Sequence, residues 1–116
     1  MRLLTAAQKQ QLIENGRLRV ETTQRYPARP FDPEPVVKLF VGPCTWLLTE
    51  IDPQNADLAF GLCDPGLGFP ELGYVSLQEL DSLTQPAVER DPDFTAKGPL
   101  SHYTKEAQRT GGIRDE

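Results

Sequence analysis

The chain has 116 residues, 38% of them hydrophobic, and a formal net charge of −5 at pH 7. This length accommodates a single core, so we expect one domain over residues 1–116. No apolar run approaches the roughly 20 residues that a membrane span needs. The N-terminal stretch also lacks the apolar segment of a signal peptide, so we expect a cytoplasmic protein with reduced thiols.

The charges are unevenly distributed along the chain. Residues 1–30 carry six Lys/Arg and two Asp/Glu, whereas residues 31–95 carry two Lys/Arg and twelve Asp/Glu. An acidic body repels phosphate backbones, which disfavours general nucleic-acid binding. The charge either keeps the protein in solution or offers an acidic face to a basic partner.

The N-terminal region predicts a helix followed by an arm. Thr5 and Gln8 form a capping box, and Gly16 is a typical helix end, so the helix is expected over residues 5–15. Residues 17–35 contain four prolines and little hydrophobic periodicity. They predict an extended, basic, Pro-rich arm or loop.

The rest of the chain alternates short apolar runs with turn residues. Residues 36–41 and 45–51 predict a hairpin in the middle of a sheet, because both runs are apolar at nearly every position. Later elements are expected as strands at 58–63 and 71–76, a short helix after the Ser76/Glu79 capping box, an edge strand at 87–91 and a helix at 100–109. This order predicts an α+β fold. It would be a small antiparallel sheet of four to five strands with an N-terminal helix, a short middle helix and a C-terminal helix.

The glycine-rich stretch "FGLCDPGLGFPELGYVSLQEL", residues 60–80, could suggest a phosphate-binding loop. It lacks the G-x-G-x-x-G spacing, Pro70 removes one amide, and a strand follows the glycines instead of a helix. Asp64-Pro65-Gly66 is instead typical of a turn in which glycine takes a positive φ. We expect a stiff connection that exposes Phe69 as a recognition element.

No group of residues suggests catalysis or metal binding. His102 is the single histidine, and no nucleophile with an orienting group is evident near it. Cys44 and Cys63 lack paired C-x-x-C spacing, so we expect them to be reduced, buried thiols without metal. The sequence thus predicts a protein that is not an enzyme and needs no cofactor.

Several motifs together resemble a known family. "PVVKLF", "TWLLTE", "AVERD" and, most specifically, the block over residues 60–80 are similar to the family catalogued as domain of unknown function 2958. The resemblance covers most of the chain and implies no established activity. It implies a small cytoplasmic accessory protein of plasmids, phages and other mobile DNA. The longer basic, Pro-rich segment at about Arg17 to Pro30 departs from the family pattern.

Two functions follow from these observations. The first is a non-enzymatic, protein-binding accessory protein, with a counter-defence inhibitor of the antirestriction or anti-CRISPR type as one such role. Its partner would present a basic surface to acidic loops near one end of the sheet. The candidate contact residues are Asp52, Asp57, Asp64, Phe69 and Glu71.

The alternative is a nucleic-acid-binding accessory protein for plasmid transfer or maintenance. It would use the basic arm for phosphates and an aromatic ring for stacking. The candidate residues are Arg17, Arg19, Arg25, Tyr26 and Arg29.

Overall fold

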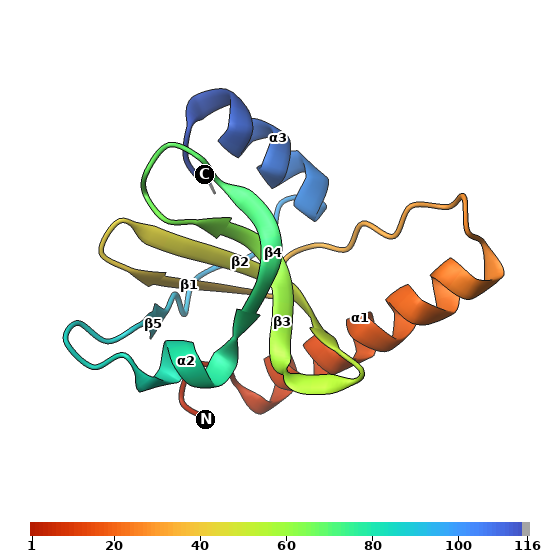
Figure 1. The fold of residues 1–116 in the computed structure, drawn as a ribbon, viewed down its shortest axis with the longest axis horizontal. Helices are drawn as coiled ribbons and strands as arrows, with labels where there is room; N and C mark the ends of the chain where they lie inside the picture. The colour runs from red at the N-terminus through yellow and green to blue at the C-terminus, as the bar shows by residue number, and fades with distance from the viewer. Residues whose placement is uncertain (115–116) are drawn as a thin grey trace.

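The computed structural model describes residues 1–114 of the chain and has an α+β fold (Figure 1). The helices are α1 (Ala6–Arg25), α2 (Leu77–Ser82) and α3 (Leu100–Thr110). The strands are β1 (Val37–Val41), β2 (Cys44–Asp52), β3 (Asn55–Asp64), β4 (Glu71–Ser76) and β5 (Glu89–Arg90). They form one antiparallel sheet in the order β4-β3-β2-β1-β5, which confirms the predicted fold class.

Strands β1 to β4 follow one another as a meander, with β2 at the centre of the sheet. The predicted hairpin in the middle of the sheet is therefore confirmed. Strand β3 is longer than the expected 58–63, because the turn before it shrinks to Pro53 and Gln54. After β4 the chain forms α2 and crosses beneath the sheet to place β5 beside β1 (Figure 1).

Helix α1 begins as predicted and ends nine residues past Gly16. The reciprocal capping box between Thr5 and Gln8 is present, but α1 continues to Arg25. Gly16 is a packing position: a Cβ there would lie 1.9 Å from the carbonyl oxygen of Ile51 in β2. The glycine thus allows close helix–strand contact, and its interpretation as a helix end was wrong. No helix within residues 1–114 is both long and apolar enough to cross a membrane.

The two faces of the sheet are covered to different extents. On one face, α1 and α2 pack over the larger core, whose fully buried members include Leu12, Leu39 and Leu48. On the other face, α3 packs over a smaller cluster around Leu47 and Leu62. The second cluster covers only part of its face, and the remainder is available to form a site.

Helix α3 is fixed at its N-terminus by the loop that follows α1. Its N-cap residue is Pro99, which makes no side-chain capping bond. Asp32 caps the helix instead, accepting from the Ser101 amide at 3.0 Å and from the Ser101 hydroxyl. The Leu100 amide donates to the Pro33 carbonyl at 2.9 Å. The end of the Pro-rich loop is thus attached to α3.

Candidate functional site

The proposed acidic face is divided between the two ends of the sheet. Asp52 and Asp57 flank the β2–β3 turn, whereas Asp64, Phe69 and Glu71 lie at the other end of β3. Asp64 lies seven positions after Asp57 along an extended strand, which corresponds to roughly 20 Å. The structure therefore does not bring the five candidate residues together on one surface.

The carboxylates at the β2–β3 turn serve local structure. Asp52 accepts from the Gln54 amide at 2.8 Å and closes the turn. Asp57 accepts from the Ser76 hydroxyl and from the Gln78 amide at 2.8 Å, so it caps α2 from a neighbouring strand. Ser76 also accepts from the Glu79 amide, as predicted for the start of this helix. Both carboxylates thus have partners within the fold.

Asp64 was expected on an exposed loop, and its side chain is buried instead, at 7% exposure. One carboxylate oxygen accepts from the Gly66 amide at 2.8 Å, and the other accepts from the Ile113 amide at 2.9 Å. Asp64 therefore clamps the β3–β4 loop to the segment that follows α3. A carboxylate in this position stabilises the loop.

The first part of the basic arm, residues 17–25, is helical, which corrects the expected loop over residues 17–35. Arg17 and Arg25 both lie on α1, where ion pairs one turn away hold their guanidinium groups. Arg17 bonds Glu14 at 2.5 Å and Glu21 at 2.8 Å, and Arg25 lies 4.0 Å from Glu21. The hydrogen bond from Arg17 lowers the pKa of Glu14, so this pair is charged at neutral pH.

Arg19 points into the molecule. Its guanidinium forms a two-pronged bond with the buried carboxylate of Glu50 in β2, one prong being Nη2 to Oε1 at 2.8 Å. It also lies over the rings of Phe31 at 5.0 Å and Phe60 at 5.5 Å. The hydrogen bonds to Glu50 raise the pKa of Arg19 above its ordinary value. Arg19 thus joins α1 to the sheet, because a buried carboxylate requires a cationic partner.

The last two residues of the proposed arm contact each other. Tyr26 and Arg29 are exposed, with the guanidinium 5.1 Å from the ring centroid. They lie beyond the end of α1, whereas Arg19 is directed toward β2. The five residues therefore do not form one continuous basic surface.

The thiols are more exposed than predicted. Cys44 and Cys63 are free and only half-buried. The Cys44 thiol donates to the Pro65 carbonyl at 3.5 Å. Burial raises the pKa of the Cys63 thiol to about 11, which keeps it protonated. Among residues 1–114, no three His, Cys, Asp or Glu side chains are placed to hold a metal ion.

Exposed apolar side chains gather on the β3–β4 loop and on β4. Leu67 and Phe69 form a pair that we call the loop tip, and each is 75% exposed. Leu72 and Tyr74 follow on β4, at 49% and 54% exposure. The sequence pointed to Phe69 but not to the other three. The apolar residues two apart in "ELGYVS" were the available signal, because alternate residues of a strand share one face.

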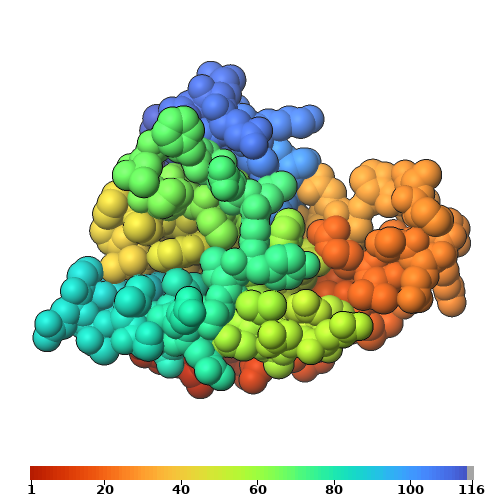
Figure 2. Space-filling view, in the orientation of Figure 1, coloured from red at the N-terminus to blue at the C-terminus, as the bar shows by residue number. Residues whose placement is uncertain are grey.

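The loop tip is held in place by its surroundings. Gly66 has a φ of +80°, and a Cβ there would lie 2.8 Å from the Pro43 carbonyl oxygen. Gly68 lies against Gly111 at the end of α3. Figures 1 and 2 show this loop, in green, beside the blue α3. The glycines of the loop have positive φ as predicted, and the apolar tip is supported on two sides.

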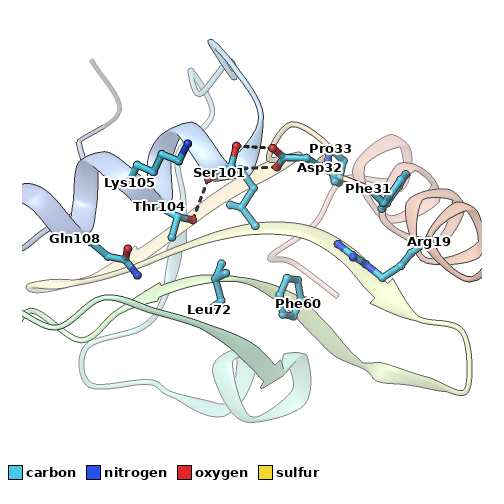
Figure 3. A pocket seen from close by; sticks show the side chains of 11 residues that line it. Arg19, Phe31, Asp32, Pro33, Phe60, Leu72, Ser101, Thr104, Lys105 and Gln108 are labelled. Carbon is cyan, nitrogen blue, oxygen red and sulfur yellow. Dashed lines mark hydrogen bonds between the residues drawn. The ribbon is translucent and has the colours of Figure 1, made fainter. Parts of the chain in front are cut away.

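A groove of about 490 Å³ lies beside these residues, between α3, the sheet and the loop after α1 (Figure 3). Phe60 and Leu72 of the sheet line one side of it, and α3 lies opposite. The full lining comprises Arg19, Phe31, Asp32, Pro33, Phe60, Leu72, Leu100, Ser101, Thr104, Lys105 and Gln108. A space of this size and apolar character suits a small ligand or an anchoring side chain.

The polar groups of the groove differ in their availability. Arg19, Asp32 and Ser101 are engaged with other groups of the fold. The Thr104 hydroxyl donates to the Leu100 carbonyl at 3.0 Å. Lys105 is exposed on α3 and has no ion-pair partner among the residues that the structure describes. The groove thus offers an apolar surface with one available cation.

Comparison with protein families shows a match over nearly the whole chain. The model of the family described as protein of unknown function (DUF2958) matches residues 3–114. The chain therefore belongs to this family, as its sequence motifs suggested. No curated protein and no solved structure matches the chain significantly.

Proposed function

We propose that this protein is a non-enzymatic accessory protein that binds another protein through the loop tip and the groove beside α3. The observation that carries the proposal is the exposure of Leu67 and Phe69, each 75%, on a loop held by Asp64. Exposing two large apolar side chains on a fixed loop is unfavourable unless a partner covers them. Apolar anchors at the centre of a contact commonly supply most of its binding free energy.

The groove supports a particular kind of partner. Its apolar surface would accept an aliphatic or aromatic side chain, and Lys105 would attract a carboxylate at the rim. We therefore propose a partner segment with an apolar anchor close to an acidic residue. Given the mobile-DNA setting suggested by the sequence motifs, a host or defence protein is the partner class that we propose.

The contacts of the acidic and basic residues favour this surface over the two expected from sequence. Asp57 and Asp64 are occupied with backbone amides, and Arg17 and Arg19 with carboxylates. Using these groups for a partner would require breaking bonds within the fold. The loop tip has no such cost.

A capture experiment tests the proposal. The wild-type protein is immobilised beside a Leu67→Ser/Phe69→Ser variant and exposed to an extract of host cells. The matched control is Ile13→Ser/Val20→Ser, which removes two apolar side chains of 42% and 44% exposure from α1. Bound proteins are identified by mass spectrometry, and each is then produced and titrated by calorimetry.

We expect a partner that binds the wild type and the α1 control and is lost by the loop-tip variant. A partner that binds all three proteins equally would contradict the proposed surface. Binding of the purified partner that is lost on charge reversal at Glu71 or Arg29, and is unaffected by substitution of Phe69, would also contradict the proposed surface.

A further inference from the structure

The outer edge of β4 is a second surface, which no strand or helix within residues 1–114 pairs with. Strand β4 is the first strand of the sheet, and its pairing with β3 runs over six residues without a register shift. Edge strands of natural proteins commonly carry lysine, proline or a bulge, which prevents pairing with another chain. Strand β4, "ELGYVS", has none of these three, and its one charged residue is Glu71 at its start.

Strand β4 also exposes apolar side chains that could pack against a second strand. Leu72 and Tyr74 lie on the same face of the strand and are 49% and 54% exposed. The Tyr74 ring contacts Phe60 of β3 at 5.1 Å between centroids, so it stands in a fixed position. An exposed, regular and apolar edge predicts strand addition.

We propose that a second copy of this chain covers this edge, by antiparallel pairing of β4 with β4 about a twofold axis at Gly73. In this register Leu72 of each copy lies opposite Tyr74 of the other. Directly opposed residues share one face of an antiparallel pair, so both apolar pairs form on the same side. The two five-stranded sheets become one continuous sheet.

No charge repulsion opposes this register. Glu71 of one copy lies opposite Val75 of the other, so no like charges face each other across the axis. A Cβ at Gly73 would meet no atom within 4 Å, so the axis passes through a position free of obstruction within one chain. The register pairs Leu72 with Tyr74 and Glu71 with Val75 in both directions across the axis. The contact is therefore isologous, with one patch binding the same patch of the second copy.

Sedimentation of the full chain tests the proposal. We expect the wild type to approach twice the monomer mass of 13.0 kDa with rising concentration. Leu72→Lys and Tyr74→Glu should each raise the dissociation constant by about tenfold or more, because each places a charge against an apolar group in both pairs. Circular dichroism would check that each variant is folded.

Mixing the two variants tests the register. A heterodimer of Leu72→Lys with Tyr74→Glu has one Lys–Glu pair and one native Tyr–Leu pair, so association should return. A mixture of Leu72→Lys with Leu72→Glu places no opposite charges together and should remain dissociated. Recovery in the second mixture only, or in neither, would overturn the register.

Two further outcomes would overturn the proposal itself. One is a wild type that stays monomeric at all concentrations, which would leave the edge for a foreign segment. The other is a dimer that both variants retain, which would place the contact elsewhere. Neither outcome depends on the partner proposed for Leu67 and Phe69, because no other protein is present in the experiment.

Discussion

The two edges of the sheet are built in opposite ways. Strand β5 has two residues, Glu89 and Arg90, both charged, with prolines at positions 86 and 92 on either side. Strand β4 has six residues, and two of its apolar side chains are about half exposed. Short, charged edges resist pairing, whereas long, apolar edges promote it.

The N-terminal residues of the chain also contact the segment that contains β5. Arg2 donates to the Val88 carbonyl at 2.6 Å and pairs with Asp81 at 3.3 Å. Arg90 donates to the Arg2 carbonyl at 3.1 Å. No comparable contact crosses the outer edge of β4 among residues 1–114. We therefore expect β5 to contribute to stability and β4 to association, and each prediction below tests one side of this contrast.

The largest expected effect is on the alkylation rate of Cys63, which reports how stably β4 pairs with β3. Cys63 of β3 pairs with Glu71 of β4, and its thiol has a pKa of about 11 against an ordinary 9.0. At pH 8 the thiolate fraction should be about a hundredfold below that of an ordinary thiol, which slows alkylation by the same factor. Iodoacetamide labelling followed by mass spectrometry measures the rate.

The sign of the pH dependence follows from the raised pKa. The folded state favours the protonated thiol of Cys63, because its pKa is raised from 9.0 to about 11. This contribution to the free energy of unfolding is fully present below pH 9 and is lost as the pH rises toward 11. Cys63→Ser should remove that part of the decline. Labelling of Cys63 in the native protein at the rate of the unfolded chain would indicate that β4 detaches readily.

The second prediction concerns the β5 edge. Val88 precedes β5 and is fully buried in the larger core. Val88→Ala should lower the free energy of unfolding by about 2 to 3 kcal/mol, because it leaves a cavity beside the sheet. Denaturant unfolding measures the loss, and the dimer dissociation constant should not change. A change in association with no loss of stability would reverse the roles assigned to the two edges.

The third prediction concerns Asp64, which holds the loop that leads into β4. Asp64→Ala removes the acceptor of the Gly66 and Ile113 amides. Leaving these donors without a partner should cost about 1 to 2 kcal/mol of unfolding free energy. Asp64→Asn retains one acceptor oxygen and should cost less. An Asp64→Ala protein as stable as the wild type would show that the clamp is dispensable.

The smallest effect is expected from a matched pair of lysines. Glu89→Lys changes an exposed residue of β5 and should alter the free energy of unfolding by less than about 0.5 kcal/mol. It should also leave the dimer unchanged, whereas Leu72→Lys should dissociate it. Sedimentation of both variants at equal concentration makes the comparison. Equal dissociation by the two variants would point to overall charge and not to a particular edge.

The fold class was predictable because its signals are local. The Thr5/Gln8 capping box, the N-cap Ser76 and the apolar runs lie within a few residues of the elements that they determine. A local signal has the same meaning wherever the rest of the chain lies. The order of elements then restricted the sheet to a few antiparallel arrangements.

The errors came from residues whose partners are distant in sequence. Gly16 resembles a helix end until the Ile51 carbonyl is placed beside it. Arg19 resembles a free cation until Glu50, 31 residues away, lies next to it. Asp64 resembles a surface charge, although its amide partner Ile113 is 49 residues along the chain. Sequence identifies such groups but not the contacts that occupy them.

Hydrogen exchange of the backbone amides tests the contrast between the two edges most directly. The measurement follows residues 71–76 and 89–90 of the wild type over a range of protein concentrations. We predict that the outward amides of β4 exchange more slowly as the concentration rises, because pairing with a second copy protects them. Those of β5 should exchange at the same rate throughout. Exchange in β4 that does not depend on concentration would contradict the account.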